Sequence, residues 1–120
     1  MFKQGDIVVV KFPFTDGSEF KRRPAMIISN AKVNKTKDYL LVQITSKYHE
    51  DGLTFPINDN DCLISLPLKS FIRAHKVFTV NKNLILSKIT QVNPHFFNQI
   101  SDEIVSLISK EKSNQQKNED

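Results

Sequence analysis

The sequence of 120 residues has the length of one domain and carries a formal net charge of +4, with an isoelectric point of about 9.2. No apolar run approaches the roughly 20 residues of a membrane-spanning helix, and the first ten residues lack the apolar segment of a signal peptide. The single cysteine, Cys62, excludes an internal disulfide, so we expect a small cytoplasmic protein whose mild positive charge permits contact with a polyanion.

Four short strands are predicted in the first half of the chain, at residues 6–12, 24–29, 39–46 and 53–57. Pro56 places the fourth of them at a sheet edge, because proline cannot donate to a strand ladder. Residues 13–20 are rich in Pro, Asp, Gly and Ser and predict a mobile loop hinged at Gly17. Residues 30–38 are polar and are expected to end in a turn.

The second half predicts a long strand at 69–80, a short turn with a final strand at 84–92, and one helix. Strict alternation puts Phe71, Arg73, His75, Val77 and Thr79 on one face of the long strand, and Ile72, Ala74, Lys76, Phe78 and Val80 on the other. Asn93 and Pro94 are typical of a helix start, and apolar residues at spacings of three and four continue to about residue 109.

These elements predict a mainly β (α+β) protein with one domain at residues 1–110 and a polar, disordered tail at 111–120. Five or six short strands with one C-terminal helix favour a strongly curved antiparallel sheet or a partly open barrel.

Arg23 is the first candidate functional residue. It precedes Pro24, which holds its backbone extended, and the apolar run behind it anchors that backbone in the core. A guanidinium on so rigid a mount is suited to gripping phosphate oxygens. The alternative is that Lys21, Arg22 and Arg23 only protect a sheet edge against aggregation.

The other candidates are hydroxyls and a basic cluster. Thr45 and Ser46 end the third strand and can donate to a phosphate oxygen, although strand-end hydroxyls are common. Ser70, Arg73, His75 and Lys76 form the cluster, in which His75 can exchange a proton near neutral pH or be purely structural. The three histidines lack metal-ligand spacing, and no cofactor motif is present, so we expect neither a metal nor a cofactor.

The segment 5–29 resembles the N-terminus of the PemK/MazF-like toxins of bacterial toxin–antitoxin systems; it reads GDIVVVKFPFTDGSEFKRRPAMIIS. The matching features are the Gly-Asp that opens a strand, the Phe-Pro-Phe that leads into a loop, and the Arg-Pro before an apolar strand. Residues 42–46 and 69–89 resemble further blocks of the family, and the resemblance covers roughly residues 4–109.

The resemblance implies a small SH3-like, PemK-type barrel with a C-terminal helix, usually a homodimer. It implies a metal-independent endoribonuclease that cuts single-stranded RNA at short sequences through a 2′,3′-cyclic phosphate, and that a cognate antitoxin protein blocks. Arg23 matches the family's catalytic arginine, and Thr45, with Ser46 beside it, its catalytic hydroxyl. Members often carry an acid where His75 stands, so His75 either takes over proton transfer or weakens the site.

The hypothesis for the roles is Arg23 as phosphate clamp and possible acid, Thr45 as hydrogen-bond donor, and His75 as base or RNA contact. The expected RNA-binding residues are Phe14, Thr15, Ser18, Glu19, Lys21, Arg22, Ser70, Arg73 and Lys76. The loop 13–20 would be a gate in which Phe14 and Phe20 stack on bases or pack on the barrel. Two alternatives stay open: a toxin of the same fold that binds a protein, as gyrase poisons do, and a catalytically weakened RNA-binding or autoregulatory module.

Overall fold

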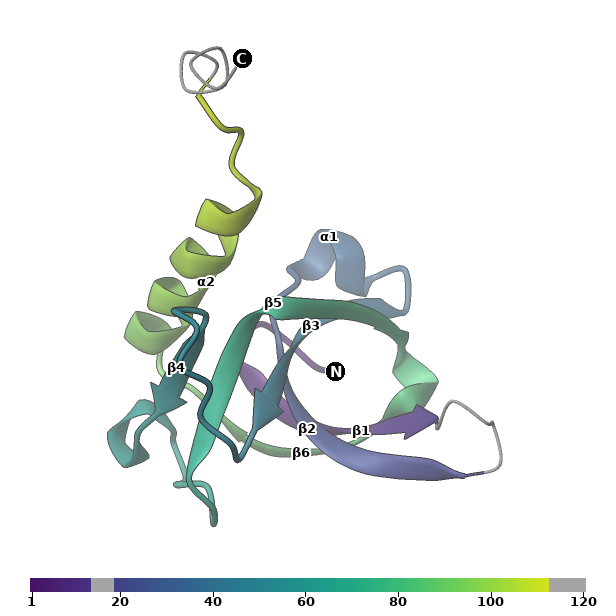
Figure 1. The fold of residues 1–120 in the computed structure, drawn as a ribbon. Helices are drawn as coiled ribbons and strands as arrows, with labels where there is room; N and C mark the ends of the chain where they lie inside the picture. Colours follow the sequence, from purple (N-terminus) through teal and green to yellow (C-terminus); the bar gives the residue numbers. More distant parts are fainter. Residues whose placement is uncertain (14–18, 113–120) are drawn as a thin grey trace.

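The computed structural model describes residues 1–13 and 19–112, which fold around a single curved sheet (Figure 1). The strands are β1 (Asp6–Pro13), β2 (Phe20–Ile27), β3 (Asp38–Thr45), β4 (Thr54–Ile57), β5 (Ser70–Asn81) and β6 (Ile85–Gln91). The α-helices are α1 (Ala31–Asn34) and α2 (Pro94–Ile108), and the 3-10 helices are η1 (Asp59–Asp61) and η2 (Lys82–Leu84).

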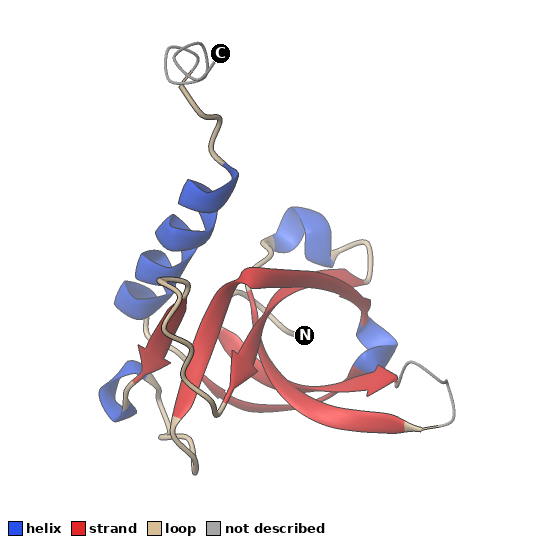
Figure 2. Ribbon diagram, viewed as in Figure 1, coloured by secondary structure: helices blue, strands red, loops and turns tan. Residues whose placement is uncertain are grey.

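All the strand pairs are antiparallel, in the order β4-β5-β3-β2-β1-β6. The sheet curls so that β1, β2, β3, β5 and β6 surround a common interior, while β4 and α2 stand on the outer side (Figure 2). The predicted fold class, a mainly β protein with a curved antiparallel sheet and a C-terminal helix, is confirmed. Residues 113–120 of the expected tail lie outside the described residues.

Two apolar clusters cover the two faces of the sheet. The barrel interior is formed by Val8, Val10, Ala25, Ile27, Tyr39, Leu41, Val80 and Ile85. The outer face beneath α2 is formed by Ile7, Met26, Val42, Ile44, Ile57, Ile72, Val92, Phe96 and Ile100. Successive strand residues point to opposite faces, which is why the neighbours Ile7 and Val8 enter different clusters. Full burial of each large aliphatic side chain contributes roughly 1.5–3 kcal/mol.

The helix α2 begins where the sequence predicts. The Asn93 side chain accepts a 2.7 Å hydrogen bond from the Phe96 backbone N–H, and Pro94 occupies the first helical turn, where its missing N–H costs nothing. Phe96 and Ile100 are the buried residues of the helix. They dock α2 on the outer face of the sheet and leave the interior to the strands.

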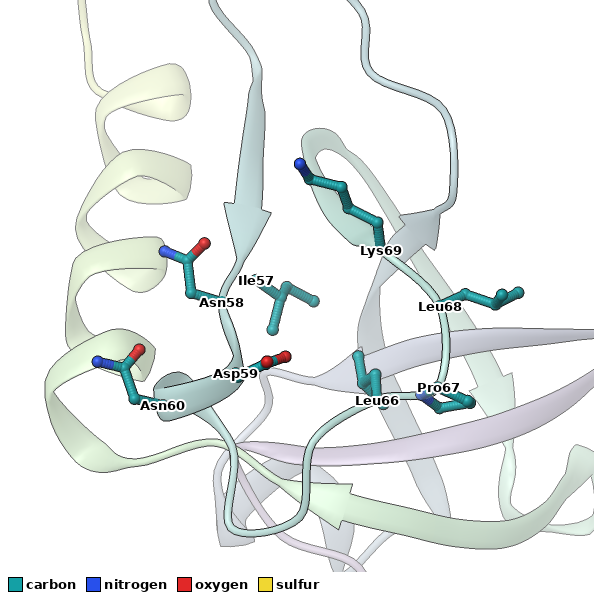
Figure 3. Close-up of a pocket in the computed structure, with 8 residues that line it drawn as sticks. All are labelled: Ile57, Asn58, Asp59, Asn60, Leu66, Pro67, Leu68 and Lys69. Carbon is teal, nitrogen blue, oxygen red and sulfur yellow. The ribbon is translucent and has the colours of Figure 1, made fainter.

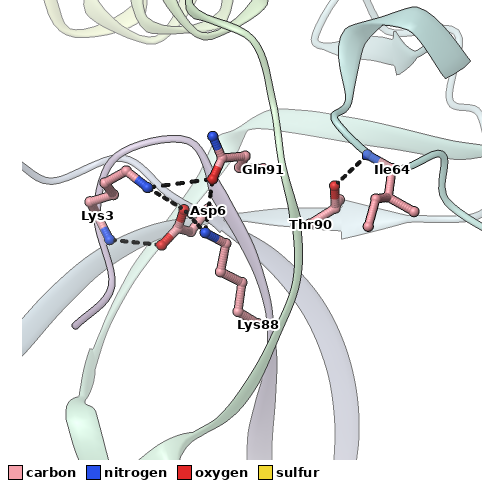
Figure 4. Close-up of polar contacts among 6 residues, drawn as sticks. All are labelled: Lys3, Asp6, Ile64, Lys88, Thr90 and Gln91. Carbon is pink, nitrogen blue, oxygen red and sulfur yellow. Dashed lines mark hydrogen bonds and ion pairs between the residues drawn. The ribbon is translucent and has the colours of Figure 1, made fainter.

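The carboxylate of Asp6 is buried at the start of β1 and joins the N-terminus to β6 (Figure 4). Its Oδ1 lies 3.5 Å from Lys3 Nζ and 3.1 Å from Lys88 Nζ, and its Oδ2 accepts from the Lys3 backbone N–H at 3.0 Å. Gln91 Oε1 accepts from both lysines. Oδ1 is therefore compensated by charge, although neither lysine gives it a well-aligned hydrogen bond.

The β1–β2 hairpin is longer than predicted. Phe20 already pairs with Pro13, so β2 begins there and not at residue 24, and the connecting loop is correspondingly shorter than 13–20. Pro24 lies inside β2, although the sequence predicts a strand start there. It is tolerated because β2 pairs with β3 only from Ala25 onward, and the missing N–H of Pro24 interrupts no bond to β3. The short helix α1 lies within the polar segment 30–38, for which the sequence predicts only a turn at the end.

A bend in β5 breaks the regular register. Val42 of β3 pairs with Val77, but the next residue, Gln43, pairs with Arg73. Residues 74–76 are thus extra residues on β5 with no counterpart on β3. Such an irregularity bends the strand and increases its local twist.

The bend also reverses the faces of β5, because an odd number of extra residues moves every later side chain to the other side. Ile72 packs beneath α2, whereas Phe78 and Val80 pack in the barrel interior. Strict alternation over 69–80 predicts one shared face for these three residues, and that prediction is wrong. Lys76, expected on their face, is exposed.

Candidate nucleic-acid interface

Three neighbouring strands present polar side chains on one face at one end of the sheet. Ala25 and Gln43 form the last pair of β2 and β3, and two residues further along these strands lie Arg23 and Thr45. Gln43 also pairs with Arg73 of β5. Because residues two apart in a strand share a face, Arg23, Thr45 and Arg73 all belong to the interior side of the sheet, at its open end.

A pocket of about 290 Å³ lies at this end, lined by Phe12, Arg23, Gln43, Lys76, Val77 and Phe78. The Phe12 and Phe78 rings contact each other with centroids 5.0 Å apart and give the pocket an apolar wall. Arg23 and Lys76 are exposed beside that wall. Cations next to an apolar surface are the combination with which proteins hold the phosphates and bases of a single nucleic-acid strand.

The hydroxyl of Thr45 is half-buried at the last residue of β3, where Thr45 pairs with Phe71. Its Oγ1 accepts from the Lys47 backbone N–H at 3.2 Å. This contact uses a lone pair of the oxygen and not the hydroxyl proton, so Thr45 can still donate to an anion. Ser46 follows outside the strand and is exposed.

The side chains of Arg73 and His75 contact each other, as the sequence predicts for residues two apart on one strand. Arg73 Nη2 lies 3.5 Å from His75 Nε2 and donates to Asp51 Oδ2 at 3.0 Å. The Arg73 side chain is only 12% exposed, and the irregular register of β5 places it beside Gln43 of the pocket. His75 itself is exposed to solvent.

Asp51 is a member of this cluster that the sequence reading missed. Its pKa is lowered, chiefly by the hydrogen bond from the Leu53 backbone N–H and further by Thr54 and Arg73, while partial desolvation opposes the shift. Asp51 is therefore a carboxylate at neutral pH. An acid inside a polar loop gave no signal of its own, because its pairing with Arg73 depends on the path of the chain between β3 and β5.

The cations of the β1–β2 ribbon divide between its two faces. Lys21 pairs with the interior residue Phe12 and so shares the face of Arg23. Arg22 pairs with Lys11 on the opposite face, where both cations lie over the ring of Phe20, at 5.4 Å and 4.3 Å from its centroid. The structure therefore separates Arg22 and Phe20 from Arg23.

The remaining expected RNA-binding residues are dispersed. Glu19 is exposed at the tip of the ribbon. Ser70 is buried at the start of β5 and donates to the Leu68 carbonyl at 2.9 Å, so its hydroxyl is not presented with the site. Phe14, Thr15 and Ser18 lie outside the described residues, as does Gly17, the predicted hinge of the loop 13–20.

The largest pocket described, about 600 Å³, lies elsewhere (Figure 3). It is lined by Ile57, Asn58, Asp59, Asn60, Leu66, Pro67, Leu68 and Lys69, from the end of β4, from η1 and from the segment before β5. It shares no residue with the pocket beside Arg23.

Within residues 1–13 and 19–112, no group of three or more His, Cys, Asp or Glu side chains is placed to hold a metal ion. None of the helices in the described part of the chain is long and apolar enough to cross a membrane.

The curved sheet, the C-terminal helix and an open end where Arg23 and Lys76 line a pocket define a small barrel protein with a face suited to anions. The family described as the PemK-like, MazF-like toxin of type II toxin–antitoxin systems matches residues 3–108, and the chain belongs to that family. The resemblance drawn from the sequence is thereby confirmed. No curated protein sequence matches the chain.

Solved structures share the fold at low sequence identity. A mycobacterial endoribonuclease in complex with its cognate antitoxin is 19% identical, with a TM-score of 0.72 over 88% of this chain and 93% of the other. The MazE–MazF structure from Deinococcus radiodurans is 16% identical, with a TM-score of 0.74 over 89% and 95% of the two chains. The toxin MazF-mt6 from Mycobacterium tuberculosis is 13% identical, with a TM-score of 0.61 over 81% and 91%.

Proposed function

We propose that the chain is the toxin of a toxin–antitoxin pair and that it cleaves single-stranded RNA as a metal-independent endoribonuclease. Membership of the toxin family supports the first part. The second part is supported by fold neighbours described as endoribonucleases and by the pocket at the open end of the barrel, which Arg23 and Lys76 line. We infer a cytoplasmic location, where RNA substrate is abundant and a single free cysteine is stable.

The chemistry proposed uses the RNA's own 2′-hydroxyl as nucleophile. Its oxygen forms a bond to the adjacent phosphorus, the bond from phosphorus to the 5′-oxygen breaks, and the products are a 2′,3′-cyclic phosphate and a 5′-hydroxyl. One proton leaves the 2′-hydroxyl and one joins the 5′-oxygen. Arg23 stabilises the charge that develops on the phosphoryl oxygens, Thr45 donates a hydrogen bond to them, and His75 exchanges the proton.

The observation that carries this proposal is the register that sets Arg23, Thr45 and Arg73 on one face of β2, β3 and β5. A phosphate at this end meets donors from three strands of one rigid sheet. Donors fixed before the reaction stabilise the transition state without reorganisation, and losing one of them typically costs about 3 kcal/mol, or about a hundredfold in rate.

The test is incubation of the purified protein with a long single-stranded RNA in EDTA, with the ends of the fragments mapped. Arg23→Ala is expected to slow cleavage about a hundredfold or more. Arg22→Ala removes the same charge from the opposite face of the ribbon and is expected to slow cleavage far less. Discrete fragments with 5′-hydroxyl ends, lost only with Arg23→Ala, would support the proposal.

Intact RNA with the unaltered protein would contradict it. A growth defect that then survives Arg23→Ala would favour a toxin that acts by binding a protein. RNA binding without cleavage would favour a catalytically weakened RNA-binding or autoregulatory module.

The partners we propose are single-stranded RNA, a cognate antitoxin protein and a second copy of the chain. The antitoxin is supported by the fold neighbours, which include toxin–antitoxin complexes. The homodimer follows from the family resemblance. Sedimentation of the purified protein, alone and after co-expression with the neighbouring gene product, would test both assemblies.

A further inference from the structure

Asp51 is anchored more firmly than its place in a loop suggests. Its Oδ1 accepts from the Leu53 backbone N–H at 2.9 Å and from Thr54 Oγ1 at 3.0 Å. Thr54 is buried as the first residue of β4. One carboxylate oxygen is thus tied to the start of a strand, which fixes the direction of the other oxygen, Oδ2.

Oδ2 is bonded to Arg73, a side chain that is largely removed from water. The guanidinium donates from Nη2 to Asp51 at 3.0 Å, and the same nitrogen lies 3.5 Å from His75 Nε2. The Nε of Arg73 is buried and has no hydrogen-bond partner in the structure. A guanidinium this desolvated needs a compensating charge. Asp51 is the carboxylate that forms an ion pair with it among the described residues.

The Arg73 guanidinium that Asp51 holds lies near the open end of the barrel. Arg73 pairs with Gln43, and Gln43 lines the pocket together with Arg23 and Lys76. Through its pairing with Gln43, Arg73 belongs to the face that Arg23 and Thr45 share. The carboxylate therefore lies one side chain away from the position of the scissile phosphate in the proposed function.

We propose that Asp51 is a positioning residue of the ribonuclease site: it fixes the Arg73 guanidinium beside His75, so that Arg73 forms a second, preorganised phosphate contact opposite Arg23. This inference rests on the proposed function. Asp51 acts through Arg73 and does not touch the RNA. The carboxylate of this cluster, Asp51, comes from the loop before β4, whereas β5 contributes His75.

The negative charge of Asp51 has opposite effects on RNA binding and on cleavage, and this difference can be measured. A carboxylate beside the RNA path repels a polyanion, so removing its charge favours RNA binding. Removing its grip on Arg73 releases the guanidinium and slows the chemical step. A positioning role therefore separates the two quantities: cleavage slows while the dissociation constant for RNA stays the same or falls.

The variant that isolates this role is Asp51→Asn. The amide retains the oxygen that accepts from Leu53 and Thr54, and it replaces only the oxygen that accepts from Arg73. Glu50→Gln is the matched control, because it removes the same charge from the adjacent, exposed position. Both are measured in single-turnover cleavage at saturating RNA, with RNA affinity and melting temperature determined at the same salt concentration.

We expect Asp51→Asn to lower the cleavage rate constant about tenfold, a size typical of coupling between contacting residues. Glu50→Gln is expected to leave that rate constant unchanged. In an Arg73→Ala background, Asp51→Asn should have no further effect, because the residue through which it acts is absent.

An Asp51→Asn protein that cleaves at the normal rate, or one whose effect persists in full without Arg73, would overturn the inference. If Asp51→Asn does not fold, Arg73→Lys is the substitute variant, since it keeps the positive charge and loses the forked donors of the guanidinium. Unchanged cleavage by Arg73→Lys would also overturn the inference. Intact RNA with the unaltered protein would overturn the proposed function and this inference with it.

Discussion

Ile100 provides a sharp test of how α2 is held on the sheet. Its side chain is 0% exposed and packs in the outer cluster with residues that include Ile7, Ile72 and Phe96. Ile100→Ala removes buried methyl groups and leaves a cavity that strands on one side and helix on the other cannot readily close. Substitutions of this kind cost 2–5 kcal/mol, and for this fully buried site we expect about 3 kcal/mol.

This loss of unfolding free energy lowers the melting temperature by a large amount. For a domain of this size, 1 kcal/mol lowers the melting temperature by roughly 4–5 °C, so Ile100→Ala should melt about 12–15 °C lower. The control is Ile108→Ala on the same helix, where the side chain is 80% exposed and a change within about 0.5 kcal/mol is expected. Calorimetry of both variants measures the two melting temperatures. Equal melting temperatures for the two variants would show that α2 is not docked through this cluster.

Three further predictions concern the open end of the barrel. Thr45→Val keeps the shape and removes the hydroxyl; it should slow cleavage at saturating RNA by about tenfold to a hundredfold, and an unchanged rate would exclude Thr45 as a donor. Lys76→Ala should weaken RNA binding and reduce the salt slope of the dissociation constant by about 1, whereas Lys32→Ala, on α1, should leave the slope unchanged. The pKa of Asp51 is lowered from its usual 3.8 in the folded state, so its contribution to stability is present above that pH and is lost as the pH falls through the folded value. The melting temperatures of the natural protein and of Asp51→Asn should therefore differ at pH 6 and converge as the pH falls below the lowered pKa of Asp51; a difference that stays constant as the pH is lowered would contradict the assignment.

The elements that could be predicted from the sequence are those whose signals are local. The β-branched run of β1 needs no distant partner to be recognised. The same holds for α2, because Asn93 caps it, Pro94 opens it and its apolar residues repeat at helical spacing. The Arg-Pro pair that marked Arg23 is also local, and the resemblance to the toxin family rested on such short stretches.

Local patterns thus predict a curved β domain with a C-terminal helix, and they single out Arg23, Thr45 and Arg73. Tertiary structure decided how these residues are combined. The irregular register between β3 and β5 paired Arg73 with Gln43, which lines the pocket, and reversed the faces of β5 beyond it. Pairing in the ribbon sent Arg22 to the side opposite Arg23, and the loop before β4 brought Asp51 to Arg73. The physical reason is that strand register and loop path depend on contacts between distant segments, which a one-residue shift alters without any change in local pattern.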